Sequence, residues 1–386
     1  MDHRRTRIAI ALVFAVHGTV SGSFAARLLS IKEGLEVGSG LLGAALMAQA
    51  LGAFVAMSMA SRLIHRFGAK GALRVSMVAW PLALPLPALM PNIYTFAAAM
   101  FIMGAAAGTS TITTNAQAVV VEHEVGRSIM TGLHGMWSVG NLVGAGLGAL
   151  AIRADLDPRV HFAALAVVAL GLAQLSCSVL PADVPVADAA PPPPRFAIPA
   201  KAIVAIGLVG FCSSFIEGAS HNWTSIYIKE ITGSTAAVAA LGYTAFVAAM
   251  AAARLVGDLV VRRVGPVATV RTGASLAALG ALTVTLATHP AVGVIGFVLI
   301  GGGAAVTIPL AAAAGGRVGA TPAQGVAGVM TITFTAGLIA PTTIGGIADA
   351  TSMRVSFALV CAVAVTMAVL ATALGRRRAP EVVKAA

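Results

Sequence analysis

The stretch that decides the fold runs from Ala200 to Ile228, AKAIVAIGLVGFCSSFIEGASHNWTSIYI. It is long enough for a helix that crosses a lipid bilayer, which takes about 20 residues. Its second half carries Glu217, His221 and Asn222. Glu217 lies about 25 Å along such a helix, where an ionised side chain is costly unless it faces a partner or a wet cavity. The stretch predicts a membrane-spanning helix with a functional carboxylate. The alternative is that Glu217 is protonated, forms a hydrogen bond to a neighbouring helix and has a structural role only.

The composition of the whole chain fits a membrane protein. Hydrophobic residues make up 58% and charged residues 10% of the 386 residues, and the mean hydropathy is +0.92. Soluble domains carry about 25% charged residues. The apolar runs are longer than soluble core helices, and they lack the alternation of an outer-membrane barrel. We therefore expect an all-α membrane protein.

The charged and reactive residues argue against several other classes. The net charge is +11, but the basic residues are scattered over short loops and termini, which is not the pattern of a nucleic-acid surface. Cys177, Cys212 and Cys361 each lie in an apolar run without metal-ligand spacing. No set of nucleophile, base and orienting residue is recognisable. We expect no nucleic-acid partner, no metal, no cofactor and no enzymatic activity.

The chain divides into twelve apolar runs of membrane-spanning length. The expected spans are Ile8 to Leu29, Gly38 to Ala60, Ala72 to Met90, Tyr94 to Val121, Ser128 to Ile152, Val160 to Leu180, Ala200 to Ile228, Ala236 to Val261, Val267 to Thr288, Pro290 to Gly315, Pro322 to Ala348 and Met353 to Leu374. The stretch from Pro181 to Pro199 is polar and rich in proline, which cannot stay helical. The sequence predicts a six-helix bundle over 1–180, a linker over 181–199 and a second six-helix bundle over 200–386.

The two halves repeat one another at a constant offset. Ile31-Lys32-Glu33 aligns with Ile228-Lys229-Glu230, and Arg66-Phe67-Gly68 aligns with Arg263-Val264-Gly265. These matches fall at the ends of corresponding helices, so they predict two pseudo-symmetric halves in parallel register. Most of the lysines and arginines fall on the side that holds both termini and the linker. By the positive-inside rule, we expect that side to face the cytoplasm.

Several motifs resemble the major facilitator superfamily, and the resemblance extends along the whole chain. The segment from Ser61 to Lys70, SRLIHRFGAK, is similar to that family's cytoplasmic motif Gly-x-x-x-Asp-Arg-x-Gly-x-Lys, with Ser61 in place of the glycine and His65 in place of the aspartate. Four further stretches resemble a bacterial inner-membrane branch of this family. They are Ala25-Ala26-Arg27, Asn115 to Val119, His134 to Ser138, and Glu217 to Trp223 with Tyr227. The resemblance implies twelve helices in two six-helix halves, with helices 1, 4, 7 and 10 around a central cavity.

The polar residues inside the spans, placed by this resemblance, give the candidate site. For proton coupling we expect Glu217 and His221, which lie four residues apart on one helix face. A satisfied hydrogen bond between helices is the alternative for any single polar residue in a span. Candidate ligands of the solute are His17, Arg27, Asn115, Gln117, His134, Trp137, Asn141, Asn222, Trp223 and Tyr227. Candidate residues of the cytoplasmic gate are His65, Arg66, Arg127, Arg254, Asp258 and Arg263.

Two ion pairs are also expected. Arg254 and Asp258 lie one turn apart near the inner end of helix 8, so they can pair and take part in the gate. Arg27 lies near the outer end of helix 1, where pairing with Glu33 or Glu36 is favoured over binding of a solute.

Glycines at every fourth residue mark a close helix contact. Gly140, Gly144 and Gly148 form a stripe of small residues on helix 5, which lets another helix approach closely. The resemblance implies that this partner is helix 8 of the other half. The stripe would then be a surface on which the halves move.

The sequence favours a secondary active transporter that moves a small organic solute by alternating access, with Glu217 as proton carrier. Symport and antiport use the same parts, so import and the efflux of drugs or metabolites both stay open. The alternative class is a non-transporting receptor or sensor on a carrier fold. We expect a monomer in the inner (plasma) membrane, with the solute, protons and lipid as partners.

Overall fold

The structure is a computed structural model that describes residues 3–126, 129–181, 201–318 and 322–375. Over these ranges the chain forms helices joined by turns, and twelve stretches are long and apolar enough to cross a membrane. The prediction of an all-α membrane protein with twelve spans is confirmed. The linker predicted over 181–199 lies outside the described residues, except for Pro181.

The first half contributes six of these spans. Its helices are α1 (His3–Leu35), α2 (Ser39–Ala83), α3 (Leu86–Leu89), α4 (Ile93–Val125), α5 (Met130–Arg153) and α6 (Pro158–Val179). Two spans share α2, which consists of two helices on either side of a kink at Gly68, where φ is 69° and ψ is 173°. Glycine adopts this positive φ without the clash that a Cβ would cause. The segment from Ser61 to Lys70, expected to join the second and third spans, contains this break and is helical on both sides of Gly68.

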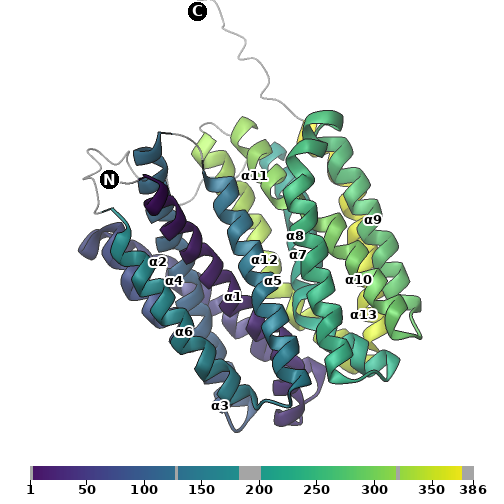
Figure 1. Cartoon of the computed structure of the whole chain (residues 1–386). Helices are drawn as coiled ribbons and strands as arrows, with labels where there is room; N and C mark the ends of the chain where they lie inside the picture. The colour runs from purple at the N-terminus through teal and green to yellow at the C-terminus, as the bar shows by residue number, and fades with distance from the viewer. Residues whose placement is uncertain (1–2, 127–128, 182–200, 319–321, 376–386) are drawn as a thin grey trace, which may run out of the picture.

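The second half contributes the other six spans (Figure 1). Its helices are α7 (Lys201–Thr232), α8 (Ala236–Val264), α9 (Pro266–Leu286), α10 (Pro290–Ala304), α11 (Thr307–Val318), α12 (Pro322–Ala350) and α13 (Met353–Leu370), followed by the 3-10 helix η1 (Ala371–Gly375). α10 and α11 form one span that is interrupted at Ala305 and Val306. Pro309 explains the interruption, because it has no N–H for the carbonyl of Ala305 and its ring crowds that carbonyl.

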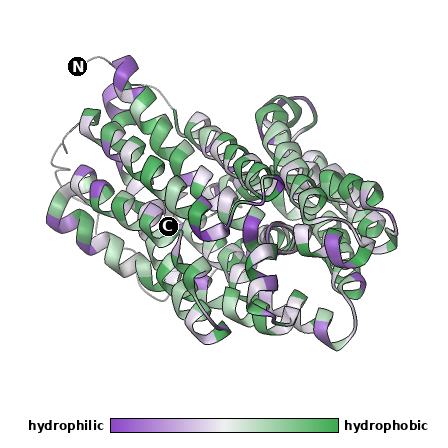
Figure 2. Ribbon diagram, turned by 60° about the horizontal axis from the view of Figure 1, so that its bottom comes forward, coloured by the Kyte–Doolittle hydropathy of each residue, from purple (hydrophilic) through white to green (hydrophobic). Residues whose placement is uncertain are grey.

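The two halves lie side by side and meet along two pairs of helices, α2 with α12 and α5 with α8. Within the halves, α1 packs on α5, α2 on α4, α7 on α12 and α9 on α10. The end of the bundle where α1 begins and η1 ends is the upper end in Figure 1 and is called the terminal end; the opposite end is the distal end. Hydrophobic residues, in green, recur along all the helices in Figure 2, as expected for helices that cross a membrane.

The glycine stripe of α5 packs on α1, which belongs to the same half. A Cβ added to Gly140 would lie 1.9 Å from the carbonyl oxygen of Ala15, and one added to Gly144 would lie 2.0 Å from that of Thr19. Only glycine allows the two backbones to come this close. The expectation that the stripe forms a moving surface against helix 8 is therefore wrong. It holds the first half together.

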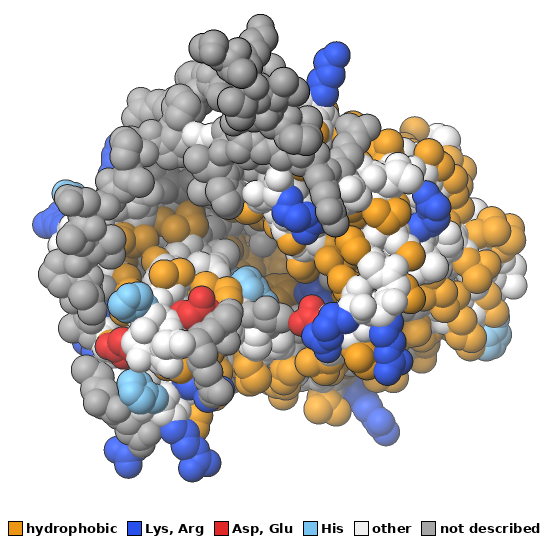
Figure 3. All heavy atoms as spheres, turned by 90° about the horizontal axis from the view of Figure 1, so that it is seen from above, with side chains coloured by type: hydrophobic (Ala, Val, Ile, Leu, Met, Phe, Trp, Pro, Cys, Tyr) orange, Lys and Arg blue, Asp and Glu red, His pale blue; other side chains and the backbone are white. Residues whose placement is uncertain are grey.

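The halves are joined at the distal end. Ion pairs connect Lys32 with Glu230 and Lys229 with Glu33, between the last turns of α1 and α7. The backbones of α2 and α12 also touch there. At the terminal end the surface is hollowed between the halves, as Figure 3 shows. The structure is thus closed at the distal end and open at the terminal end.

Candidate functional site

An ion pair connects two spans inside the second half. The Nη2 atom of Arg254 on α8 lies 3.1 Å from Oε2 of Glu217 on α7. The side chains of the two residues are 24% and 14% exposed, respectively. Inside a membrane, a charge of either sign is stabilised by an opposite charge or by a polar cavity, since hydrocarbon does not solvate it. Glu217 therefore has a charged partner on a neighbouring helix.

Two further hydrogen bonds fix the guanidinium of Arg254. Its Nε donates to the carbonyl oxygen of Ala305 at 3.1 Å. That carbonyl is available because Pro309 lacks the N–H that would bond it in an unbroken helix. Nη1 donates to Oγ of Ser138 at 3.3 Å, and Ser138 lies on α5 of the other half. Arg254 thus joins α7, α8 and the interruption after α10 to the first half.

His221 follows Glu217 by one helical turn and is held by aromatic residues of α8. Its Nδ1 lies 2.8 Å from the hydroxyl of Tyr243. The ring of Phe246 meets the imidazole edge-on, with centroids 5.9 Å apart and an interplanar angle of 87°. Glu217 and His221 therefore share one helix face, and both face α8.

The first half contributes a second polar cluster around His17 of α1. The indole Nε1 of Trp137 donates to Nδ1 of His17 at 3.1 Å, and Nε2 of His17 lies 3.3 Å from Oγ1 of Thr111. The imidazole also stacks on Trp80, with ring centroids 5.2 Å apart. Because Nδ1 accepts, the neutral ring carries its proton on Nε2 and donates it to Thr111. This arrangement fixes the orientation of Trp137.

A small cavity separates the two clusters. It is lined by Trp137, Ser138 and Asn141 of α5, His221 of α7, and Val247, Met250, Ala251 and Arg254 of α8. About 10 Å³ is open to the centre of a water molecule, which is close to the minimum for one buried water. Asn141 is 1% exposed, and neither its Oδ1 nor its Nδ2 has a partner among the described residues. A buried amide without partners is unfavourable, so this position fits a bound group.

The ion pair of Arg254 differs from the one expected. Arg254 bonds Glu217 in place of Asp258, whose side chain is exposed near the end of α8. The sequence contained a usable signal, because Arg254 is the single basic residue within its predicted span and Glu217 is a lone acid within another. Opposite charges at intramembrane positions are expected to pair. The prediction chose Asp258 instead, because Asp258 is only four residues from Arg254 in the chain. The prediction failed because it considered one helix alone.

Comparison with known proteins identifies the family. Residues 10–208 match the Major Facilitator Superfamily. An uncharacterized transporter of Sinorhizobium fredii is 30% identical over 366 residues, which cover 95% of this chain and 97% of the relative. The chain belongs to the major facilitator superfamily. An uncharacterized MFS-type transporter of Yersinia pestis is 29% identical to this superfamily member, with 96% of each chain covered. The membrane protein MosC of Rhizobium meliloti is also 29% identical, with 97% of this chain and 92% of the relative covered.

Solved structures confirm the fold of this superfamily member. The nucleoside transporter NupG, as its D323A mutant, superposes with a TM-score of 0.78 at 12% identity, covering 96% of this chain and all (100%) of that chain. A bacterial homologue of the lysosomal transporter Spinster, inward-facing and unoccupied, gives a TM-score of 0.74 at 12% identity, with 98% and 99% covered. FucP in its outward conformation gives 0.65 at 14% identity, with 96% and 98% covered. At these identities the likeness concerns the fold alone.

Some of the predicted solute ligands lie near this cavity of the transporter and others at its edge. Trp137 and Asn141 line it, and His17 bonds Trp137. Asn115 is half-buried and donates from Nδ2 to the carbonyl of Thr111 at 2.8 Å. Asn222 is half-buried on α7, and His134 is exposed near the start of α5. The roles predicted for these residues stay predictions.

Three other predicted ligands are buried and do not line the cavity. Trp223 and Tyr227 are both fully buried at 0% exposed, and the Tyr227 hydroxyl donates to the carbonyl of Val284. Gln117 is also buried and donates from Nε2 to the carbonyl of Pro181 at 3.1 Å. The indole Nε1 of Trp223 and Oε1 of Gln117 are buried without a partner among the described residues, and the roles predicted for these three residues stay predictions.

Arg27 does not form the ion pair that was expected. It is 3% exposed and donates from Nη2 to the carbonyl of Leu156, in the turn between α5 and α6. Glu33 is instead paired with Lys229 of the other half. The side chain of Arg27 turns into its own half because a backbone acceptor is available there. The expected pairing with Glu33 or Glu36 is therefore wrong.

The remaining gate candidates lie on the surface at helix ends. His65 and Arg66 are exposed just before the bend of α2, with the Arg66 guanidinium 5.2 Å from the centroid of the Phe67 ring. Asp258 and Arg263 are exposed toward the end of α8. Arg127 lies outside the described residues. In the open conformation at this end, their part in a gate stays a prediction. Within the described ranges, no three His, Cys, Asp or Glu side chains gather as metal ligands would.

Proposed function

We propose that this superfamily member is a proton-coupled secondary transporter of a small organic solute and that Glu217 carries the proton. The observation that carries the proposal is the pair of Glu217 and Arg254 inside the bundle, 3.1 Å apart. A carboxylate at this depth alternates between an ionised state paired with Arg254 and a protonated, neutral state. Protonation removes the ionic attraction, so the proton changes the contact between α7 and α8.

The pair is placed so that this change reaches both halves. Arg254 also bonds Ser138 of α5, and α5 with α8 is one of the two helix pairs along which the halves meet. Alternating access requires the halves to tilt around a site near their interface. A proton on Glu217 would therefore alter a contact that the tilt must break or reform.

The membrane orientation is part of the proposal. Basic residues of α1 and of the bend in α2 lie toward the terminal end, among them Arg4, Arg7 and Arg66. The positive-inside rule supports a cytoplasmic terminal end in the plasma membrane of the cell. The conformation with a closed distal end is then inward-open. We further propose that the transporter acts as a monomer.

Proton flux in reconstituted vesicles tests the function. Purified protein is placed in proteoliposomes that enclose a pH-sensitive dye, and a panel of organic acids, amino acids, sugars and hydrophobic cations is added outside. We expect at least one solute to move protons in the wild-type protein. Glu217→Gln should abolish solute-driven proton flux and retain exchange of labelled solute across the membrane.

Glu36→Gln is the matched control, because it makes the same chemical change at an exposed residue of the distal turn. It should leave proton flux unchanged. Solute accumulation by Glu217→Gln at the wild-type rate under a pH gradient would contradict the assignment of the proton. Specific solute binding without flux of either solute or protons would favour a receptor.

A further inference from the structure

We propose that the solute is an organic carboxylate bearing a hydroxyl group, and that its carboxylate takes the place of Glu217 on Arg254. The inference deepens the proposed function and rests on it. Arg254 stays charged throughout, because arginine is not deprotonated in proteins, whereas the carboxylate of Glu217 can take up a proton. When Glu217 is neutral, Arg254 loses the counter-ion that the structure provides.

The guanidinium has donors left for a second anion. It carries five N–H donors, and the bonds to Glu217, Ala305 and Ser138 use three different nitrogens with one donor each. The Nη1 and Nη2 atoms each keep a further N–H. Arg254 also lines the small cavity, so these donors can reach a group that enters it.

The cavity supplies the complementary groups for the rest of the solute. Asn141 is 1% exposed with both amide atoms unpartnered among the described residues, and it lines the same cavity as Arg254. A side-chain amide offers both donors and an acceptor, and a hydroxyl group both accepts and donates. Trp137 gives an aromatic wall whose N–H is already used by His17. The cavity holds about one water in this conformation, so a hydroxy carboxylate would satisfy Arg254 and Asn141 together once the halves move apart and widen it.

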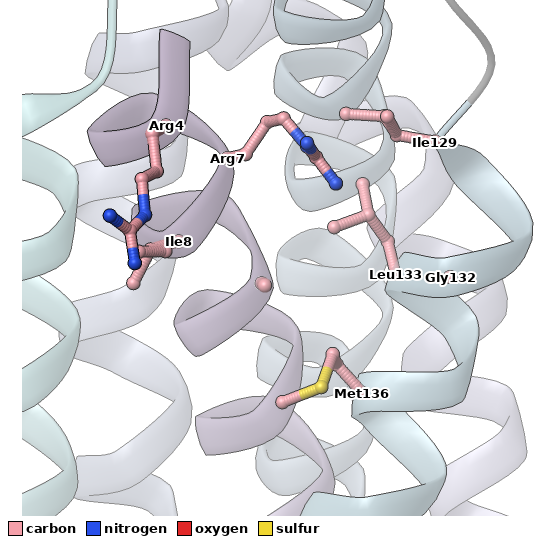
Figure 4. A pocket seen from close by; sticks show the side chains of 8 residues that line it. Arg4, Arg7, Ile8, Ile129, Gly132, Leu133 and Met136 are labelled. Carbon is pink, nitrogen blue, oxygen red and sulfur yellow. The ribbon is translucent and has the colours of Figure 1, made fainter. Parts of the chain in front are cut away.

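A second pocket, with basic residues at its rim, lies at the terminal end. This pocket, of about 380 Å³, lies between the starts of α1 and α5. Figure 4 shows Arg4 and Arg7 near its upper rim and Met136 deeper, with Ile129 and Leu133 on the side of α5. None of the described residues that line it is acidic. The charge of Arg7 at this rim favours the approach of anions over that of cations.

The exchange couples proton and anion with balanced charge. A proton binds the Glu217 carboxylate, Arg254 transfers its ion pair to the solute carboxylate, and on release the proton leaves and Glu217 returns to Arg254. Arg254 has an anionic partner in every stable state. A proton without the solute would leave Arg254 unpaired, and the solute without a proton would place two carboxylates on one cation. One proton and one monoanion move together, so the cycle transfers no net charge.

The test measures binding and charge movement with defined probes. Lactate, glycerate and gluconate are compared with glycerol, lactamide and the zwitterion serine in proteoliposomes of the full chain. We expect the carboxylates alone to move protons, at a rate that an imposed membrane potential does not change. Arg254→Lys should weaken carboxylate binding about tenfold, because the planar fork of donors is lost. Arg254→Gln should abolish binding, and Arg271→Gln, at an exposed arginine of α9, should not affect it.

The pH dependence of binding identifies the exchanging group. The titratable groups around the pair are His221 and Tyr243 of the second half, and His17 and His134 of the first. In the wild-type protein, carboxylate affinity should fall as pH rises, because ionised Glu217 competes for Arg254. In Glu217→Gln the affinity should be retained and should no longer depend on pH. If the dependence persists there and disappears in His221→Gln, the exchange with Glu217 is wrong.

The outcomes separate this inference from the proposed function. Proton flux driven by a neutral or cationic solute would overturn the carboxylate assignment and leave the proton role of Glu217 in place. Carboxylate binding that Arg254→Gln does not weaken would overturn it as well. Carboxylate transport that moves no protons would instead contradict the proposed function and leave the anion site in place. If Arg254→Gln does not fold, the carboxylate affinities of Arg254→Lys and Glu217→Gln decide whether Arg254 binds the solute. A folded wild-type protein that neither binds nor moves any carboxylate of the panel overturns the inference.

Discussion

The reciprocal ion pairs at the distal end should set the balance between the conformations. Lys32 pairs with Glu230 and Lys229 with Glu33, so each half contributes one lysine and one glutamate to the contact. These residues are the two copies of the Ile-Lys-Glu repeat. The pairs join α1 to α7 and exist only while the distal end is closed. Breaking them should therefore favour the conformation that is open at the distal end.

The exposure of the pairs gives the expected magnitude. The side chains of Lys32 and Glu230 are 11% and 38% exposed, and those of Lys229 and Glu33 are 34% and 45% exposed. Partly exposed pairs of this kind contribute about 0.2–1 kcal/mol each. Both pairs together then stabilise the closed distal end by about 0.4–2 kcal/mol, or about 2-fold to 30-fold in population. High salt should reduce this preference, since the charges are accessible to ions.

Charge reversal and charge exchange test the gate. Spin labels at Leu89→Cys and Thr288→Cys, on the distal turns of the two halves, report the separation of the halves by pulsed electron resonance, in a background without Cys177, Cys212 and Cys361. Lys32→Glu should increase the population with the longer distance. Lys32→Glu combined with Glu230→Lys restores opposite charges and should return the distribution toward that of the parent. An unchanged distribution in the single variant, or no recovery in the double variant, would refute the reasoning.

Three further changes probe contacts that hold the site in place. Gly144→Val should destabilise the first half by about 1–3 kcal/mol, because its Cβ would lie 2.0 Å from the carbonyl oxygen of Thr19. Thermal unfolding in detergent measures this loss. The control Gly146→Val should be close to neutral, because no described atom of another helix lies within 4 Å of its added Cβ. Pro309→Ala restores an N–H that competes with Arg254 for the carbonyl of Ala305, so solute-driven proton flux should fall without a loss of thermal stability; an unchanged flux would show that this carbonyl is not needed. Trp137→Phe removes the N–H that donates to His17 at 3.1 Å but keeps an aromatic ring at this position, so it should cost about 1 kcal/mol of stability; equal unfolding temperatures for parent and variant would argue against that bond.

The sequence determined the class of fold and singled out one candidate site residue, Glu217. Apolar runs of bilayer length give twelve spans because each helix must satisfy its own backbone in lipid, which is a local requirement. Glu217 was recognised for the same reason, since a carboxylate inside such a run needs a partner wherever it lies. The matching Ile-Lys-Glu segments also placed Lys32 and Lys229 at equivalent helix ends. The spans and the carboxylate depend only on residues near one another in the chain, and the repeat depends only on comparing the sequence with itself.

The tertiary structure decided which surfaces meet. Helical periodicity tells which side chains share one face of a helix, but it does not tell which other helix that face contacts. Arg254 therefore looked like a partner for Asp258, one turn away, and it bonds Glu217 of another span. Gly144 looked like a contact for the opposite half, and it packs on α1 of its own half. Each of these contacts joins residues far apart in the sequence, so only the packing of the twelve helices could select them.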